Sequence, residues 1–329
     1  MSSGNAILER YENNPILGPN RANSWESKAV FNCATLYDGS KVHMLYRAVG
    51  EYRNYISRIG YASSTDGYSF TRYNGVASEP VEDYERYGIE DPRLFILDSK
   101  TYFTYVVPSN YVRESPVVSS ALATTEDYRE FKRLGIITSK LPDDKDVVFF
   151  SERMSPTSLD KRSSNERDNK CYFSLHRPSS WIGPEYGVDR PSIWLGESVT
   201  LSNFEKFSLL LKPEKDWEVA KVGAGPPPIK TRRGWLIIYH GVSSSKVYRA
   251  GAAVVDLKKP NKVLGRSTRP ILEPEREYEI YGDVNNVVFP TGACVIDKKL
   301  FLYYGAADKV CCLATADLDT LVEYVLEQG

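Results

Sequence analysis

The sequence has few of the residues that metal-dependent, redox-active and disulfide-stabilised proteins need. It contains three histidines and five cysteines, and two of the cysteines, Cys311 and Cys312, are adjacent. This spacing fits neither a CxxC redox pair nor a zinc site, so we expect reduced, mostly buried thiols of a cytoplasmic protein and no metal ion. HExxH, EF-hand, P-loop and GxGxxG motifs are missing, which disfavours zinc proteases, nucleotide kinases and dinucleotide enzymes.

An excess of one charge and long apolar runs are also missing. The 329 residues include 42 basic and 43 acidic ones, for a formal net charge of -1, which offers no general attraction for nucleic acid or an anionic membrane. No run of 18 apolar residues exists, and the start MSSGNAILERYENNP has no apolar signal region. We therefore expect no nucleic-acid or membrane partner. Tyrosine, in contrast, is abundant, with 23 residues, and its half-apolar ring suits strands and sugar clefts.

Tyrosine-rich apolar runs of strand length recur along the whole chain. They lie at 43–47, 102–106, 172–176, 236–240 and 300–304, and the steps between their second positions are 59, 70, 64 and 64 residues. Turn sequences such as Tyr-Asp-Gly-Ser at 37–40 and Leu-Asp-Ser-Lys at 97–100 precede most of them and indicate hairpins. A further strand and an acidic turn follow each run.

Five such units of antiparallel strands predict an all-β, five-bladed β-propeller with a central active-site channel. One unit cannot bury its own faces, and closing the units into a ring removes the exposed ends. A β-sandwich is the alternative, but its turns recur about every 8–12 residues without a longer period. We expect a single catalytic domain over residues 1–329, with one clear helix at 319–328 and an exposed loop where the third unit has an insertion at 155–169.

An alignment of the units on their hairpins identifies residues that would line the channel. Counting back twelve residues from the second position of each run gives Asn32, Asp91, Gly225 and Phe289. In the third unit the insertion breaks this count, and the segment 151–153, which ends in Arg153, takes the same place. A second column at the ends of the hairpin strands reads Arg47, Val106, His176 with Arg177 beside it, His240 and Tyr304. A slip of one residue would turn a side chain to the opposite face.

Asp91 is the candidate general acid of this channel. It precedes Pro92, which cannot donate a ladder hydrogen bond, so Asp91 ends a paired stretch or lies at a bulge. The structural alternative is a turn aspartate held by Arg93. The place of Asp91 in the channel column favours the catalytic interpretation.

A group of basic residues indicates an anion site in the same channel. Each of them alone would be an ordinary surface or core residue, but cations that converge in one channel repel one another and need a counter-ion. A tetrahedral oxyanion such as phosphate matches the forked donors of arginine. The residues are Arg153, Arg177, Lys221 and His240.

These motifs together resemble glycoside hydrolase family 130, a group of five-bladed β-mannoside hydrolases and phosphorylases. The resemblance runs through Asn-Pro-Ile-Leu at 14–17, Glu-Asp-Pro-Arg-Leu at 90–94, His-Arg-Pro at 176–178, Gly-Ala-Gly-Pro-Pro-Pro-Ile at 223–229 and Tyr-Gly-Ala-Ala-Asp at 304–308. It implies that Asp91 is the acid, that Asn32, Arg47 and Asp308 bind the sugar, and that the four basic residues named above bind phosphate.

The resemblance implies inverting phosphorolysis of β-mannosides, such as mannobiose, mannooligosaccharides or mannosyl-N-acetylglucosamine and mannosyl-glucose, to α-mannose 1-phosphate. Inorganic phosphate is then a co-substrate, and no cofactor is expected. Phosphate is already anionic, so it needs one acid and a cationic pocket, whereas an inverting hydrolase needs two carboxylates. In family members the acid is thought to act through a sugar hydroxyl.

Two alternatives stay open. The first is a β-mannosidase of the same fold in which Glu273, Glu275 or Glu279 activates water, and the second is a sugar-binding propeller without catalysis. We favour a β-1,4 linkage, while the acceptor sugar, association into a homo-oligomer, and the effect of the 155–169 loop on the site stay undecided from the sequence.

Overall fold

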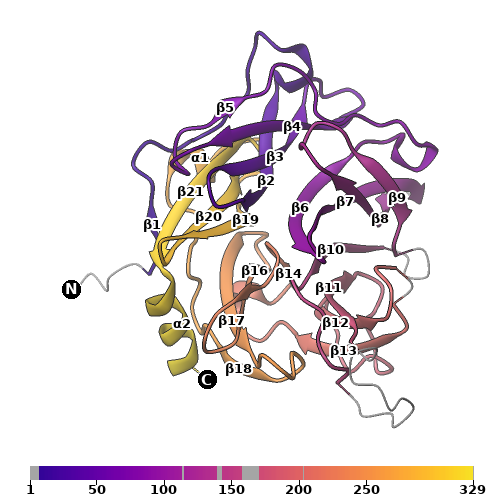
Figure 1. Ribbon diagram of the computed structural model, residues 1–329, viewed down its shortest axis with the longest axis vertical. Helices are drawn as coiled ribbons and strands as arrows, with labels where there is room; N and C mark the ends of the chain where they lie inside the picture. Colours follow the sequence, from indigo (N-terminus) through magenta and orange to yellow (C-terminus); the bar gives the residue numbers. More distant parts are fainter. Residues whose placement is uncertain (1–6, 113–114, 139–142, 158–169, 203, 329) are drawn as a thin grey trace.

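Five antiparallel sheets are arranged as blades around a central axis, which confirms the predicted five-bladed β-propeller (Figure 1). The structure is a computed structural model, and it describes residues 7–112, 115–138, 143–157, 170–202 and 204–328. In each blade the strands follow one another from the hub to the rim, so that the first strand of a blade borders the axis. No helix in these ranges is long and apolar enough to cross a membrane.

The blades contain the following strands. Blade 1 consists of β2 (Ala29–Tyr37), β3 (Val42–Val49), β4 (Ser57–Ser64) and β5 (Thr71–Arg72). Blade 2 consists of β6 (Glu90–Leu97), β7 (Lys100–Val112), β8 (Ser115–Thr125) and β9 (Lys132–Ile136). Blade 3 consists of β10 (Asp144–Phe149), β11 (Tyr172–Pro178), β12 (Ile193–Ser198) and β13 (Lys206–Leu211). Blade 4 consists of β14 (Lys221–Ala224), β15 (Ile229–Lys230), β16 (Trp235–Val242), β17 (Tyr248–Val255) and β18 (Val263–Arg266).

Blade 5 joins the two ends of the chain. Its inner strands are β19 (Val288–Ile296), β20 (Lys299–Ala306) and β21 (Val310–Asp317), and its outer strand is the N-terminal β1 (Glu9–Arg10), which pairs with β21. The pairing of both chain ends in one sheet closes the ring. The helix α2 (Leu318–Glu327) follows and confirms the helix predicted at 319–328. Its Asp317 cap accepts a hydrogen bond from the Thr320 N–H, and its apolar face is buried.

The hairpin turns have the geometry that the sequence predicts. Asp98 and Ser99 lie between β6 and β7 with φ of 48° and 61°, and Asp297 and Lys298 between β19 and β20 have φ of 49° and 67°. Two consecutive left-handed residues are typical of the type I′ turn, whose twist matches that of the flanking strands. These turns set the register of the two inner strands in each of these blades.

The apolar core lies between neighbouring blades. One cluster joins Leu236 and Val254 of blade 4 to Leu302 of blade 5 and to Leu321 of α2, all of them buried. The five cysteines are also buried and free, as the sequence predicts. Because each blade buries its faces only against its neighbours, the fold depends on the complete ring.

The tyrosine repeat has a structural cause. In blade 2 the buried Glu85 lies in a short helix (Asp83–Glu85) ahead of the first strand, accepts a hydrogen bond from the Tyr105 hydroxyl at 2.7 Å and pairs with Arg133 at 3.2 Å. Three other blades repeat this glutamate, tyrosine and arginine contact. Their members are Glu26, Tyr46 and Arg72 in blade 1, Glu218, Tyr239 and Arg266 in blade 4, and Glu279, Tyr304 and Arg10 in blade 5.

These tyrosines are fully buried, and their rings pack in the apolar clusters between neighbouring blades, so they do not face a sugar. In blade 3 the contact is replaced. His176 takes the place of the tyrosine, and its ring nitrogens lie 2.6 Å from an Asp144 oxygen and 2.7 Å from the Ser174 hydroxyl. The tyrosine repeat is therefore mainly a feature of the blade architecture.

Candidate active site

A polar pocket lies at the hub of the propeller. Its cavity has a volume of about 170 Å³. Seven of the eight predicted site residues line it, and Arg153 does not. The lining residues are Asn32, Arg47, Glu90, Asp91, Lys145, Asp146, Arg177, Lys221, His240, Tyr248, Val284, Val287, Phe289 and Asp308.

In each of the first three blades, a β-bulge directs a polar side chain into this pocket. The ladder between the first two strands shifts register at Asn32, Asp91 and Asp146, which is the bulge expected before Pro92. Their φ angles are 47°, 46° and 60°. Asparagine and aspartate adopt this left-handed conformation more readily than other non-glycine residues. The bulge therefore turns one short polar group per blade toward the axis.

The structure corrects the prediction for Arg153. Its Nη2 donates to the carbonyl of Lys170 at 2.7 Å, and its guanidinium lies 4.9 Å from the centre of the Tyr172 ring. The insertion lengthens the connection between β10 and β11, so the third-blade residue equivalent to Asp91 lies 27 positions before Phe173, and not twelve. That residue is Asp146. Residues 158–169 of the predicted loop lie outside the described residues.

Lys145 also lines the pocket, as a cation that the sequence did not predict. The pairing of β10 with β11 explains its position. Lys145 pairs across the ladder with Arg177, just as Phe31 pairs with Arg47 and Gly223 with His240. The second column therefore reads Arg47, Val106, Arg177, His240 and Gly305. The predicted column was one residue off at His176 and Tyr304, whose side chains point into the blades.

One end of the pocket holds the candidate acid in a hydrogen-bonded carboxylate cluster. The Asp91 Oδ1 atom accepts hydrogen bonds from Asn32 Nδ2 at 2.8 Å and from Arg47 Nη1 at 3.1 Å, and Arg47 Nη2 donates to Glu90 at 2.6 Å. Burial alone would raise the pKa of Asp91, but Arg47 and Arg93 outweigh it and hold this pKa below its usual value.

The two other carboxyls of this cluster, Glu90 and Asp308, have pKa values above their ordinary ones. Burial raises the pKa of Glu90 above its ordinary value in spite of Arg47. Burial also raises the pKa of Asp308 to about 6, and the nearby Asp91 and Glu90 add to the effect. The cluster thus contains three carboxyls around one guanidinium, and Glu90 and Asp308 bind a proton more readily than Asp91 does.

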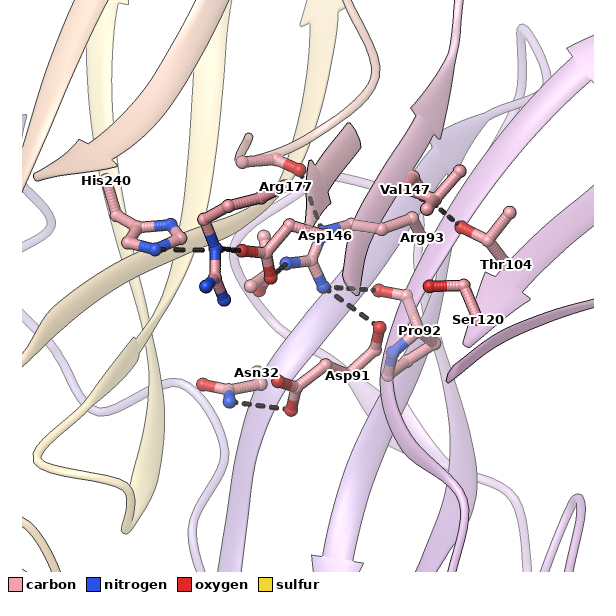
Figure 2. A network of polar contacts seen from close by, with 12 residues as sticks. Asn32, Asp91, Pro92, Arg93, Thr104, Ser120, Asp146, Val147, Arg177 and His240 are labelled. Atoms are coloured by element: carbon pink, nitrogen blue, oxygen red, sulfur yellow. Dashed lines mark hydrogen bonds and ion pairs between the residues drawn. The ribbon is translucent and has the colours of Figure 1, made fainter. Parts of the chain in front are cut away.

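The opposite end of the pocket is cationic around Asp146 (Figure 2). Arg177 Nε donates to Asp146 Oδ2 at 2.6 Å, His240 Nε2 lies 3.8 Å from the same oxygen, and Arg93 Nη2 lies 4.0 Å from Oδ1. Although burial opposes it, these neighbours, Arg177 first, hold the pKa of Asp146 far below its usual value. Lys221 completes this end, and burial together with Arg177 lowers its pKa to about 8.

His240 is neutral in the free protein. Burial, together with the cations Arg177 and Lys221, lowers its pKa well below the ordinary value. Both ring nitrogens are buried and find no hydrogen-bond partner among the described residues. A buried polar group without a partner is costly, so the ring is ready for a ligand that accepts a hydrogen bond. His240 therefore acts as a donor, and the cations of this end are Lys145, Arg177 and Lys221.

Gly223 allows these groups to meet. A Cβ atom at this position would lie 2.4 Å from Asp146 Oδ2, 2.4 Å from His240 Cε1 and 2.8 Å from Arg177 Nε. Any larger residue would separate them, which explains the glycine on this strand of blade 4.

Arg93 binds backbone carbonyls at the hub and does not contact the Asp91 carboxylate directly. It is fully buried, and it donates to the backbone carbonyls of Gly225, Asp91 and Pro92 (Figure 2). Arg93 thus holds Asp91 through its backbone carbonyl, as the structural alternative expected, but it leaves the carboxylate free of direct contact with its guanidinium. The Asp91 carboxylate accepts hydrogen bonds from Asn32 and Arg47 and lines the pocket.

The glutamates considered for a hydrolase lie elsewhere. Glu273 pairs with Arg249, Glu275 pairs with Arg10, and Glu279 belongs to the buried contact of blade 5. None of the three lines the pocket. Within the described part of the chain, no group of three or more His, Cys, Asp or Glu side chains is arranged to hold a metal ion.

Sequence reasoning missed Lys145 and Asp146 and assigned no role to Glu90. Alignment of the third unit on the apolar run that follows Asp146, in place of the hairpin, would have placed Asp146 beside Asp91. The other missed lining residues, such as Tyr248, carry no motif of their own and join the pocket only through the ring.

Comparisons with known proteins show which family the chain resembles over most of its length. The model of glycoside hydrolase family 130, described as beta-1,4-mannooligosaccharide phosphorylase, matches residues 7–327. The 1,2-beta-oligomannan phosphorylase of Thermoanaerobacter sp. (strain X514) is 36% identical over 317 residues, which cover 94% of this chain and 97% of that protein. The beta-1,2-mannobiose phosphorylase of the same strain is 36% identical over 313 residues, or 92% of this chain and 94% of that protein.

A solved structure is similar over the whole ring. The beta-1,2-mannobiose phosphorylase from Listeria innocua, in complex with beta-1,2-mannobiose, aligns with a TM-score of 0.83 at 27% identity. The alignment covers 98% of this chain and 99% of that chain.

Proposed function

The chain belongs to glycoside hydrolase family 130, and we propose that it catalyses the inverting phosphorolysis of β-mannosides to α-mannose 1-phosphate. The observation that carries the proposal is that one pocket is lined both by a carboxyl cluster around Asp91 and Arg47 and by basic groups around Asp146. This arrangement matches a reaction in which an anion attacks one side of a sugar while a proton is delivered to the other.

Inorganic phosphate occupies the cationic end. Lys145, Arg177 and Lys221 surround it with positive charge, and the neutral His240 ring donates a hydrogen bond to a phosphate oxygen. Asp146 keeps Arg177 in place and offsets part of the charge before the anion arrives. The anion thus replaces water in a site whose donors are already oriented.

Mannose lies between the two ends, with its hydroxyls on Asn32, Arg47 and Asp308. A phosphate oxygen forms a bond to the anomeric carbon while the bond to the leaving oxygen breaks. That oxygen receives a proton from Asp91, directly or through a sugar hydroxyl, and leaves as the hydroxyl of the released sugar. Attack from the face opposite to the leaving group inverts the anomeric carbon.

Asp91 must be protonated to act as the acid, although Arg47 holds it ionised in the free protein. Phosphate brings negative charge into the pocket and the sugar displaces water, and both effects raise the pKa of a nearby carboxyl. We infer that Asp91 takes up its proton together with the substrates.

Hydrolysis is the weaker candidate because the pocket offers no good base opposite Asp91. Asp146 lies at the correct end, but its pKa is far below neutral and it is occupied by Arg177. A carboxylate of such low basicity is a poor acceptor of a proton from water.

We propose β-1,2-mannobiose and its longer homologues as the first substrates to test. The family description names a β-1,4 activity, which is the linkage that the sequence favoured, whereas the two Thermoanaerobacter relatives, which align over more than nine-tenths of this chain, are named for β-1,2 mannosides. A single catalytic domain over residues 1–329 and a cytoplasmic location also remain proposals.

The experiment is to incubate the purified protein with β-1,2- or β-1,4-mannobiose, with and without phosphate, and to measure α-mannose 1-phosphate and free mannose. Phosphate-dependent formation of the sugar phosphate supports the proposal and identifies the linkage. Mannobiose cleavage at equal rates with and without phosphate would instead show a hydrolase. Saturable binding without turnover would show a sugar-binding protein.

A further inference from the structure

The direction of the reaction determines where the leaving sugar must lie. Phosphate attacks from the Lys221 and Arg177 end, and the leaving oxygen departs on the opposite side, next to Asp91. Arg47, which donates a hydrogen bond to Asp91, also lines the pocket. The groups beside Asp91 and Arg47 therefore select the leaving sugar, if the proposed function is correct.

Two tyrosines of the loop between β3 and β4 lie next to the lining residue Arg47, although neither is itself a lining residue. The Tyr55 ring centre lies 5.8 Å from the Arg47 guanidinium, and the Tyr52 ring packs on Tyr55 with centroids 6.2 Å apart and planes 19° apart. Tyr52 is 49% exposed, and Tyr55 is half-buried. Neither belongs to the buried tyrosine contacts of the blades, so the blade architecture does not explain them.

The backbone of Tyr55 carries strain. Its φ is 53°, a left-handed conformation that a large side chain rarely adopts. Such strain persists where the surrounding structure requires it, and it is frequent at binding sites. Here it holds an aromatic ring beside the sugar-facing side chain of Arg47.

Tyr52 is held by a network from another blade. Its hydroxyl donates to Asp283 at 3.0 Å and accepts from Lys309 at 2.6 Å, and Lys309 also donates to Asp283 at 2.8 Å. Asp283 adjoins the lining residue Val284, and Lys309 adjoins Asp308. The network thus connects the β3–β4 loop of blade 1 to blade 5 next to two residues that line the pocket.

The same loop of blade 5 also holds Asp308 in place. A Cβ atom at Gly282 would lie 2.1 Å from the carbonyl oxygen of Ala307, and the Val284 N–H donates to that carbonyl at 3.2 Å. Asp308 and Ala307 have left-handed φ angles of 50° and 46°. Asp308, which is proposed to bind mannose, and the Tyr52 ring are therefore both connected to the loop that contains Asp283 and Val284.

We propose that Tyr52 and Tyr55 form the subsite for the leaving sugar, with the apolar face of a pyranose packed on the exposed Tyr52 ring. The ligand class is the hexose that is released in phosphorolysis and that accepts mannose in the reverse reaction. An aromatic ring suits such a ligand because it offers apolar contact area without a fixed pattern of hydrogen bonds. This inference rests on the proposed function and deepens it.

The test separates the two sides of the pocket by running the reaction in reverse, with α-mannose 1-phosphate as donor and mannose or β-1,2-mannobiose as acceptor. Tyr52→Ala removes the ring, and Tyr55→Gly removes the second ring while it permits the left-handed backbone. We expect the KM for the acceptor to rise about tenfold in each, since that corresponds to roughly the value of one aromatic contact. The KM for α-mannose 1-phosphate should change less than about twofold.

Two further variants serve as controls for the loss of the Tyr52 ring. Tyr52→Phe keeps the ring and loses only its bonds to Asp283 and Lys309, so its acceptor KM should lie between those of the wild type and Tyr52→Ala. Tyr73→Ala removes a tyrosine that is 39% exposed and packs on Tyr61 and Arg129 in the outer part of the propeller, and it should behave as the wild type.

An unchanged acceptor KM in Tyr52→Ala, or an equal rise in both KM values, would overturn the inference. If the wild type forms no α-mannose 1-phosphate from any mannoside, the proposed function fails, and calorimetric titration with β-1,2-mannobiose tests the subsite instead. Weaker binding by Tyr52→Ala than by the wild type would then support it. Equal affinities, or no binding by the wild type, would reject it.

Discussion

The lysine at the cationic end should set the alkaline limit of activity. Burial and Arg177 lower the pKa of Lys221 to about 8, so this side chain loses its charge as the pH rises through that value. From about pH 7 to about pH 9 the charged fraction of a group with this pKa falls from roughly nine-tenths to one-tenth. If the charged form binds phosphate, kcat/KM for phosphate should fall about tenfold over this range.

The assay is the initial rate of α-mannose 1-phosphate formation at several phosphate concentrations and saturating mannobiose, repeated across this pH range. Lys221→Arg keeps the charge at every pH in the range because the guanidinium does not deprotonate, so it should remove the alkaline limb. Lys221→Met should raise the KM for phosphate about tenfold or more even at about pH 7, with a flat profile above it, since a charged hydrogen bond is lost.

Lys230→Met is the matched control. Lys230 lies in the same blade, is exposed and pairs with Glu152 outside the pocket, so its profile should match that of the wild type. An alkaline limb that persists unchanged in Lys221→Met would refute the reasoning, because some other group would then titrate. A KM for mannobiose that rises as much as the KM for phosphate would also contradict it.

Three further changes test other parts of the structure. Asp91→Asn should lower kcat/KM by a factor of about 10² to 10⁴, as expected for loss of a general acid, while its thermal unfolding midpoint stays near that of the wild type, and a variant with more than a tenth of the activity would remove Asp91 from this role. Lys145→Met should raise the KM for phosphate in steady-state assays, whereas Arg153→Met should leave it unchanged, and the opposite order would restore the phosphate-binding prediction for Arg153. Tyr105→Phe should reduce the free energy of unfolding by about 1–3 kcal/mol in urea titrations, because the buried Glu85 loses a hydrogen-bond donor, and an unchanged midpoint would show that this contact adds no stability.

The repeat made the overall fold predictable. Strand-length runs at steps of 59 to 70 residues and turns with residues such as Asp98 and Ser99 are local features, and each unit is built in the same way. The closing strand was not predicted. It is only two residues long, Glu9–Arg10, and such a segment becomes a strand only when β21 is already in place beside it.

The candidate site was predictable where the spacing between strands is constant. Asn32 and Asp91 were found by one count because blades 1 and 2 have short hairpins. The same count failed in blade 3, where the long connection hid Asp146 and suggested Arg153. A hairpin insertion changes the distance along the chain but not the ladder of hydrogen bonds, and it is the ladder that places a side chain.

The sequence by itself determined that five similar units form a ring, that Asp91 begins an inner strand, and that Arg177 and His240 lie near the ends of equivalent strands, because these facts depend on local pattern and order. Only the tertiary structure decided that Lys145 and not Arg153 lines the pocket, that the repeated tyrosines are buried in the blade architecture, and that burial and nearby cations lower the pKa of His240. These outcomes depend on burial and on charges from several blades at once, and the electrostatic energy of a group is a property of everything that surrounds it.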